Sequence, residues 1–257
     1  MSAGGERIAS AILAARKAGR PAIAAYLTAG FPSRDAFPAL LRDAATAADV
    51  IELGVPFSDP IADGVTIQEA SRVALAGGAS LAWSLRMLAA SRLAAATPIV
   101  VMSYVNPLLV YGIDSLARDA AAAGVSGFIV PDLPLEEQER LAPALRDEEL
   151  ALIQMSTPAS PPQRLLRIGG SSDGFVYAVT VTGTTGGRVD VRSGLVDYLL
   201  RVRAATAGPL LAGFGVRTAE DVAAIVPPAD GVVVGSALIA AIARGEDPSR
   251  FLKGLRP

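Results

Sequence analysis

The stretch "ADVIELGVPFSDPIADG" (residues 48–64) joins a short apolar run to an acidic loop. The run is apolar on both sides of Glu52, as in parallel strands that are covered on both faces, whereas a half-exposed strand alternates. Two prolines interrupt any further strand, and Asp59 and Asp63 follow in the resulting loop. The stretch therefore predicts a buried parallel strand with an acid near its carboxyl end, followed by a stiff loop with two more acids.

Similar apolar runs recur along the whole chain. The strand candidates lie at 22–28, 49–53, 98–104, 125–131, 150–156, 174–180, 209–214 and 231–235. Helical patterns separate them, at roughly 34–47, 78–94, 114–123, 135–147, 161–168, 194–205, 218–226 and 236–253. About eight β–α units in 257 residues fit a (β/α)8 barrel in both count and length. The alternative, a doubly wound sheet, usually has fewer strands and a GxGxxG turn after the first, which "LTAGFPS" lacks. No linker or shift of composition divides the chain, so we expect one α/β barrel domain over residues 1–257.

Three segments depart from the short-loop pattern of a simple barrel. The first 20 residues are amphipathic and predict an extra N-terminal helix. After the second strand, "TIQEASRVALAGG" (66–78) predicts an inserted helix, with Thr66 and Glu69 as a capping box. After the sixth strand, "VTGTTGGRVDVRSG" (181–194) has the composition of a mobile lid that closes over a ligand.

The composition restricts the possible chemistry. The chain has no Cys and no His, which excludes disulfides, thiolate nucleophiles and the commonest metal ligand, and we expect no metal site. Its two lysines, Lys17 and Lys253, lie outside the apolar strands where a Schiff-base lysine would be expected. Proton transfer would therefore fall to Asp, Glu or Tyr. The net charge of −2 and the absence of a basic block argue against nucleic acid, and no apolar run is long enough to span a membrane. The N-terminus lacks a signal-peptide pattern, so we expect a cytoplasmic protein.

The acids of the opening stretch are the first catalytic candidates. If Val50 points into the barrel, Glu52 points into its mouth, where the active sites of such barrels lie. Partial loss of hydration there would raise the pKa of Glu52 toward a value useful for acid–base catalysis. The alternative is a solvated or paired acid at a strand end. Asp63 could face Glu52 if the loop folds back, although Asp59 and Asp63 are also common types of turn residue.

The loops after the last two strands suggest an anion site. "AGFG" (212–215) and "VGSA" (234–237) combine exposed backbone N–H groups with the start of a helix. These loops form the usual phosphate site of such barrels, and the site would need no arginine. The alternative is that the glycines only close tight turns. The candidate phosphate-binding residues are Gly213, Gly215, Gly235 and Ser236.

A set of apolar and aromatic residues falls near the carboxyl ends of the strands. Together they could line a pocket for a flat aromatic group, or several of them could simply cover the barrel core. They are Tyr26, Met102, Tyr104, Ile129, Met155, Tyr177 and Phe214.

Six motifs along the chain resemble those of a known family. In order, they are "AYLTAGFP", "IELGVPFSDPIADGVTIQ", "PDLP", "VTGTTG", "GFGV" and "VVVGSA". The set resembles the tryptophan synthase α subunit family over essentially the whole chain. The resemblance implies a (β/α)8 barrel that cleaves indole-3-glycerol phosphate to indole and glyceraldehyde 3-phosphate, a retro-aldol reaction without a cofactor.

The resemblance also implies roles for single residues. Glu52 would be the principal acid–base, protonating C3 of the indole ring and helping to move the glycerol hydroxyl proton. Asp63 would bind the indole N–H and stabilise positive charge on the ring, and Tyr177 would assist at the glycerol chain. Gly186 would join the other candidate glycines and Ser236 around the phosphate.

The family works as an αββα complex, in which indole passes to the pyridoxal phosphate site of the β subunit. The residues that match its partner-facing segments are Pro56, Asp59, Pro60 and Pro134. A stand-alone lyase that releases free indole is the alternative. A barrel kept as a regulatory partner is disfavoured because both acids are present, and a phosphosugar isomerase is disfavoured by the arrangement of Glu52 and Asp63.

Overall fold

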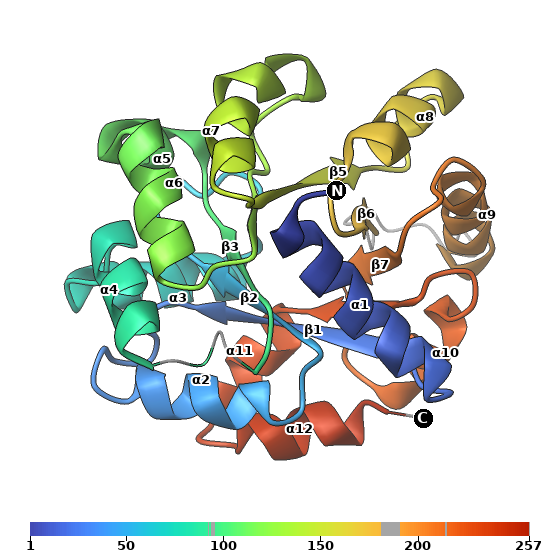
Figure 1. Cartoon of the computed structure of the whole chain (residues 1–257). Helices are drawn as coiled ribbons and strands as arrows, with labels where there is room; N and C mark the ends of the chain where they lie inside the picture. The colour runs from blue at the N-terminus through green and yellow to red at the C-terminus, as the bar shows by residue number, and fades with distance from the viewer. Residues whose placement is uncertain (92, 94–95, 181–190, 214, 257) are drawn as a thin grey trace.

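The computed structural model describes residues 1–91, 93, 96–180, 191–213 and 215–256. Eight parallel strands pair in chain order, and the last pairs with the first, so that they close a barrel (Figure 1). The strands are β1 (Ala22–Thr28), β2 (Val50–Gly54), β3 (Ile99–Met102), β4 (Gly127–Ile129), β5 (Ala151–Ser156), β6 (Val176–Val179), β7 (Leu210–Gly213) and β8 (Gly231–Val234). Each lies at its predicted position to within a few residues, and the predicted (β/α)8 fold is confirmed.

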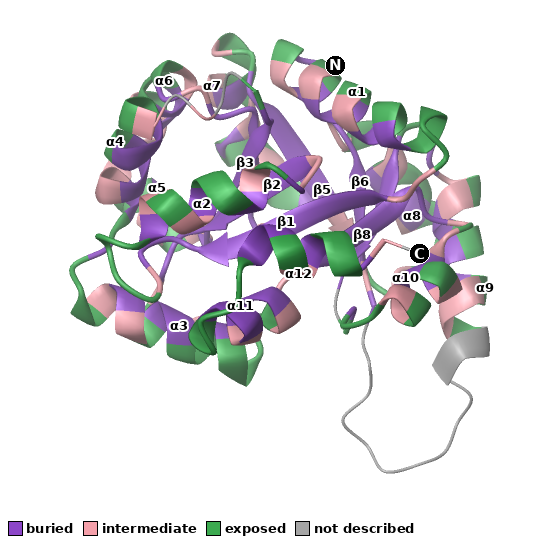
Figure 2. Cartoon of the chain, turned by 90° about the horizontal axis from the view of Figure 1, so that it is seen from below, coloured by how far each residue is buried: buried purple, intermediate pink, exposed green. Residues whose placement is uncertain are grey.

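Helices surround the barrel and turn their buried sides toward it (Figure 2). They are α1 (Ala3–Lys17), α2 (Phe37–Ala45), α3 (Val65–Ala76), α4 (Leu81–Ser91), α5 (Val105–Tyr111), α6 (Ile113–Ala122), the 3-10 helix η2 (Leu135–Arg140), α7 (Ala142–Asp147), α8 (Pro162–Ser171), α9 (Val191–Ala204), α10 (Ala219–Ile225), α11 (Ser236–Ala243) and α12 (Pro248–Gly254). The predicted N-terminal helix is α1, and the predicted inserted helix after the second strand is α3.

Several helix boundaries differ from the prediction. The segment 236–253 forms two helices instead of one, because Gly245 adopts a left-handed φ of 78° and Asp247 caps a new helix at the N–H of Arg250. Helix α5 was not predicted, and the segment 135–147 is divided between η2 and α7.

The predicted capping box of the inserted helix is wrong. The N-cap of α3 is Gly64, which has no side chain to offer, so Thr66 already lies inside the helix. Glu69 instead accepts two hydrogen bonds from Arg72, three residues further along the same exposed face. The chain does use a capping box at α10, where Thr218 and Asp221 satisfy each other's backbone N–H groups.

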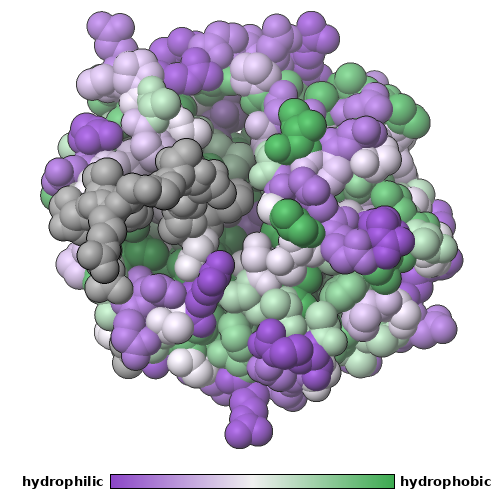
Figure 3. All heavy atoms as spheres, turned by 180° about the vertical axis from the view of Figure 1, so that it is seen from behind, coloured by the Kyte–Doolittle hydropathy of each residue, from purple (hydrophilic) through white to green (hydrophobic). Residues whose placement is uncertain are grey.

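Alternating strand residues divide the core into two layers. Ile23, Ile51 and Val101 face the helices, whereas Ala24, Val50 and Val100 face the barrel interior. Helix α1 closes the interior at the amino ends of the strands, where it crosses the centre of the view in Figure 1. Its Ile8 and Ile12 are fully buried in the same cluster as the interior strand residues. The opposite end of the barrel is therefore the one left open for a site, and Figure 3 shows a hollow on that face.

The sequence predicts no segment that spans a membrane. In the described part of the chain, no single helix is long and apolar enough to cross a membrane. Helices α3 and α4 meet that criterion only as a pair, and a bend of 85° separates them.

Candidate active site

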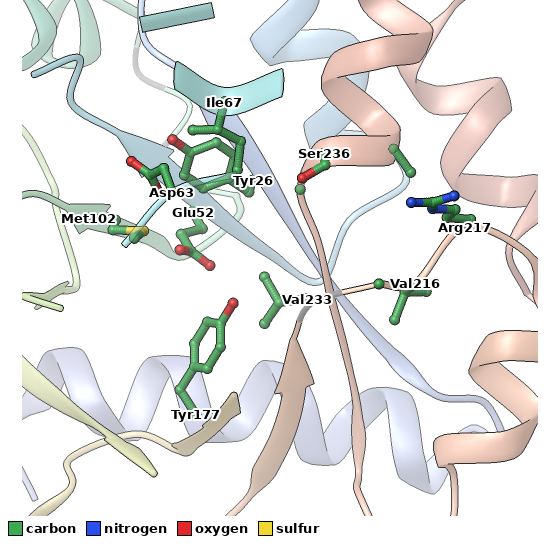
Figure 4. Close-up of a pocket in the computed structure, with 13 residues that line it drawn as sticks. Tyr26, Glu52, Asp63, Ile67, Met102, Tyr177, Val216, Arg217, Val233 and Ser236 are labelled. Carbon is green, nitrogen blue, oxygen red and sulfur yellow. The ribbon is translucent and has the colours of Figure 1, made fainter. Parts of the chain in front are cut away.

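Glu52 is the acid that the barrel buries most completely. Strand pairing places it beside Tyr26 on one side and Val100 on the other, and its side chain points into the mouth of the barrel (Figure 4). Glu52 is 2% exposed, and neither carboxylate oxygen has a hydrogen-bond partner among the described residues. Burial, and secondly the charge of Asp63, raises the pKa of Glu52 to about 8. The carboxyl group is therefore protonated near neutral pH and can donate a proton.

Asp63 reaches the same cavity from the loop that precedes α3. The loop turns back through a hydrogen bond from the Asp63 N–H to the carbonyl oxygen of Pro60 (3.1 Å). The Tyr104 hydroxyl donates to Asp63 Oδ2 at 3.2 Å and accepts from the N–H of Ala62 at 2.9 Å. Burial raises the pKa of Asp63 to about 6, while the bond from Tyr104 opposes that rise. At neutral pH the cavity thus holds a protonated Glu52 beside an ionised Asp63, two carboxyl groups in different states.

Two tyrosines flank these acids, one from the strand next to Glu52 and one from the strand across the barrel. Tyr26 comes from β1 and Tyr177 from β6, and the hydroxyl of Tyr177 is directed toward Glu52 in Figure 4. Burial raises the pKa of both phenols well above the usual value, so both hydroxyls keep their protons. Each ring lies against a glycine of the next strand: a side chain at Gly54 would overlap Tyr26, and one at Gly213 would overlap Tyr177. Glycine at these two positions therefore leaves the space that the rings of Tyr26 and Tyr177 occupy.

The other end of the cavity is built from backbone. Gly215 follows β7 with a φ of 86°, a conformation that favours glycine. Gly235 is the N-cap residue of α11 and Ser236 is its first residue, so unpaired N–H groups of the first helical turn lie at the cavity. With the helix dipole, this arrangement suits an anion.

The structure gathers most of the predicted site residues around one cavity. Those that line it are Tyr26, Glu52, Asp63, Met102, Tyr177, Gly215, Gly235 and Ser236. Gly213 and Tyr104 contact lining residues without lining the cavity themselves: Gly213 packs against Tyr177, and Tyr104 is hydrogen-bonded to Asp63. Ile129 is fully buried in the barrel interior, and Met155 packs against the same interior cluster. Neither of them lines the cavity. Phe214 and Gly186 lie outside the described residues, as does most of the predicted lid.

Some lining residues were not predicted. They are Ile67, Val216, Arg217, Val233 and Ala237. Ile67 belongs to the apolar face of the inserted helix α3, whose spacing indicated only burial, and it packs close to Gly235. Val233 follows from the alternation of β8, because it lies on the interior face. No sequence pattern indicated Arg217, since the anion site was expected to need no arginine.

The predicted partner-facing residues lie on the rim of the open end. Pro56 is buried, Pro60 is half-buried, and Asp59 and Pro134 are exposed. Three large apolar side chains of this region are more than 80% exposed: Ile61, Val65 and Val110. Hydrogen bonds join the rim loops, because Tyr104 accepts from Ala62 and the N–H of Val105 donates to Asp132 (2.8 Å).

Across the described residues, no group of three or more His, Cys, Asp or Glu could hold a metal ion.

Comparisons with known proteins agree on one family. The family model for the tryptophan synthase alpha chain matches residues 12–254. The tryptophan synthase alpha chain of Roseiflexus castenholzii is 45% identical, over 96% of this chain and 99% of its own length. That of Desulfovibrio desulfuricans is 44% identical, over 94% and 96%.

Solved structures agree with these relatives. A crystal structure of tryptophan synthase subunit alpha from Legionella pneumophila superposes with a TM-score of 0.87 at 31% identity, over 99% of this chain and 97% of that one. A chain of tryptophan synthase from Mycobacterium tuberculosis gives 0.88 at 37% identity, over 97% and 96%.

Proposed function

The chain belongs to the tryptophan synthase alpha chain family, whose members cleave indole-3-glycerol phosphate to indole and glyceraldehyde 3-phosphate, and from this premise we propose how its own residues perform that reaction. The observation that carries the proposal is the pair of acids in the cavity. Glu52 is buried with no hydrogen-bond partner among the described residues and is protonated near neutral pH, while Asp63 is ionised. A lyase that must protonate a ring carbon and stabilise the resulting cation needs such a pair.

The first step is a proton transfer from Glu52 to C3 of the indole ring. The electron pair of the C2–C3 double bond forms the new C–H bond, and positive charge develops on the ring nitrogen. The carboxylate of Asp63 accepts a hydrogen bond from the ring N–H and stabilises that charge. The apolar residues Ile67, Met102 and Val233 line the same cavity and provide surface for the flat ring.

The second step breaks the bond between C3 and the glycerol chain. Its electron pair restores the C2–C3 double bond and neutralises the ring, and the glycerol hydroxyl loses its proton to give the aldehyde. The carboxylate that Glu52 became in the first step accepts this proton, which returns the enzyme to its starting state. The Tyr177 hydroxyl faces Glu52 and would hold the glycerol oxygen in line. The ring itself accepts the electrons, so the step needs no cofactor in this chain, and the pyridoxal phosphate of tryptophan synthase belongs to the beta subunit.

The test of this assignment is Glu52→Gln. The substitution keeps the shape of the side chain but removes the proton that is transferred, so indole release should fall by at least about 100-fold. Indole formation from indole-3-glycerol phosphate is measured directly, with thermal unfolding as a check on folding. Near wild-type turnover by the variant would show that another group transfers the proton.

We further propose that this chain works in an αββα complex and passes indole to a beta subunit, and that Pro56, Asp59, Pro60 and Pro134 belong to the contact surface. The exposed Ile61 and Val65 support this, because large apolar side chains clustered on a rim mark an interaction surface. The relatives give no support to a stand-alone lyase.

Titration with a beta subunit tests the partner proposal. We expect Ile61→Asp to weaken complex formation, measured by size-exclusion chromatography or calorimetry. Leu166→Asp, on α8 and 61% exposed, is the matched control and should bind like the wild type. Equal binding by the two variants would remove Ile61 from the contact surface.

We also propose that the protein works as a single domain in the cytoplasm. Its substrate is a phosphate dianion, which does not cross a bilayer unaided and so is used in the compartment where it is made.

A further inference from the structure

The active-site cavity has two ends of opposite charge. Glu52 and Asp63 lie at one end, and Arg217 lies at the other, on the side of Ser236 (Figure 4). Arg217 lines the cavity together with Gly215 and Gly235, and it is the one cationic side chain among the described residues that do so. A single fixed cation at the anion-binding end points to a role in recognising charge.

The backbone of Arg217 is held firmly while its side chain is left available. Its N–H donates to Asp221 Oδ2 at 2.9 Å, next to the capping box that Asp221 forms with Thr218 at the start of α10. The side chain is exposed and makes no ion pair with any described residue. The guanidinium group is therefore carried by a hydrogen-bonded backbone and is not paired with an acid in the described part of the chain.

The acids of the neighbouring outer groove have other partners. Arg217 also borders an outer groove that contains Glu220, Glu246 and Asp247. Glu246 pairs with Arg244 at 2.7 Å, and Asp247 caps α12. A hydrogen bond with Thr218 lowers the pKa of Glu220, so this acid too is engaged at the helix start. Arg217 is thus not needed to balance the acids of the groove.

We propose that Arg217 binds the phosphate dianion of the substrate and makes the cavity select phosphorylated over dephosphorylated indole-glycerol substrates. This inference rests on the proposed function, because it names the part of the substrate that the Arg217 end of the cavity binds. Backbone N–H groups and a helix dipole supply only partial charges, whereas a guanidinium supplies a full charge and a planar pair of donors that matches phosphate oxygens. Because the side chain is exposed, its contribution is weakened by salt.

Steady-state kinetics of Arg217→Gln test the proposal. We expect KM for indole-3-glycerol phosphate to rise roughly 5- to 20-fold, as for a partly exposed charge-assisted hydrogen bond, with kcat changed less than about twofold. Arg217→Lys should recover part of the loss, and the rise in KM should shrink at high salt. Arg250→Gln is the matched control, because Arg250 borders the outer groove but not the cavity, and its KM should equal that of the wild type.

A substrate without the phosphate separates charge recognition from general damage to the site. With indole-3-glycerol, wild type and Arg217→Gln should have the same kcat/KM, so that the preference for the phosphorylated substrate falls by the factor lost in KM. Calorimetric titration with inorganic phosphate gives a second readout that needs no turnover, and the variant should bind more weakly by a similar factor.

The outcomes are distinct for the inference and for the function beneath it. Wild-type protein that releases no indole would refute the proposed function, while weaker phosphate binding by Arg217→Gln would still support the anion site. Active wild type with unchanged KM, substrate preference and phosphate affinity in Arg217→Gln would overturn the inference. A fall in kcat at constant KM would also overturn it, because Arg217 would then act on the reacting groups.

Discussion

The two ends of the barrel bury carboxylates in opposite ways. At the amino ends of the strands, Asp230 is 4% exposed in its side chain and accepts from Arg16 and Arg203 at 2.8 and 2.9 Å. It also accepts from the N–H of Leu210 at 2.8 Å. At the carboxyl ends, Glu52 is buried to the same degree with no hydrogen-bond partner among the described residues. Equal burial thus supports the fold at one end and leaves a group free for chemistry at the other, and the presence or absence of partners makes the difference.

The amino-end carboxylates follow one pattern. Asp49 immediately precedes β2, as Asp230 immediately precedes β8. Arg20 donates to both oxygens of Asp49 at 2.7 and 2.8 Å, and the N–H of Ile23 donates to one of them. Each acid therefore joins two neighbouring strands and a helix end into one network. We expect substitutions here to change stability, whereas substitutions at the open end should change activity.

Asp230→Ala should give the largest loss of stability. It leaves Arg16, Arg203 and the N–H of Leu210 without their shared acceptor, which should lower the free energy of unfolding by about 3–4 kcal/mol. Urea denaturation measures this, and kcat of the folded variant should stay within about twofold of the wild type. Glu69→Ala, at an exposed ion pair of α3, is the control and should leave the midpoint unchanged. A loss of kcat at unchanged stability would contradict the contrast between the two ends.

The pH dependence of stability should expose the cost of Glu52. Its pKa is about 8 in the folded chain and near the ordinary 4.5 when unfolded, so the folded state retains a proton that the unfolded state loses. Glu52 therefore lowers the free energy of unfolding progressively as pH rises from about 4.5 to about 8, with no further change above. Glu52→Gln removes this effect, so its advantage over wild type should grow by roughly 3–4 kcal/mol between pH 5 and 8.

Urea titrations of both proteins at pH 5, 6.5 and 8 measure that difference. Asp63, whose pKa is raised to about 6, adds a loss of the same sign in both proteins and so largely cancels. If the difference in the free energy of unfolding between the two proteins does not change with pH, the pKa of Glu52 is not raised in the folded chain.

Gly54→Ala should disturb the packing of side chains at the open end of the barrel. The new Cβ would overlap the ring and hydroxyl of Tyr26, which would have to move away from its place beside Glu52. We expect a loss of about 1–2 kcal/mol in stability, with a several-fold fall in kcat/KM. Tyr26→Ala in the same chain should relieve the overlap, so the stability losses of the two substitutions should not add.

A matched control for this crowding is Gly64→Ala. Gly64 has open space where its Cβ would lie and a negative φ of −74°. Strictly additive stability losses for Gly54→Ala and Tyr26→Ala would show that the ring does not depend on the glycine.

The sequence predicted the barrel and its acids better than the walls of the site. Apolar runs indicate which residues form strands, and alternation along the second strand indicates that Glu52 points into the barrel mouth. The strands and the direction of Glu52 were therefore predictable. Tyr104 was expected to line the pocket but instead holds Asp63, because its hydroxyl meets a loop whose path depends on tertiary contacts. Arg217 was not predicted for the same reason: one loop residue reaches the cavity only through the fold of its neighbours.

Tyr104→Phe should have the smallest effect on activity. It should show whether the Tyr104 hydroxyl orients the Asp63 loop or lowers the pKa of Asp63. Loss of the hydroxyl removes the donor to Asp63 Oδ2 and the acceptor of the Ala62 N–H. The ring keeps its contact with Phe57, whose centroid lies 5.2 Å from its own. Because the bond from Tyr104 lowers the pKa of Asp63, its removal raises that pKa, and the acidic limb of the pH–rate profile should move to higher pH. At pH 7 we expect kcat to fall only about 3- to 10-fold. Tyr111→Phe, which loses a bond to Asp119 on the exposed surface, should leave the profile unchanged. If the acidic limb of Tyr104→Phe coincides with that of the wild type while kcat falls, the hydroxyl would orient the loop without tuning the charge of Asp63.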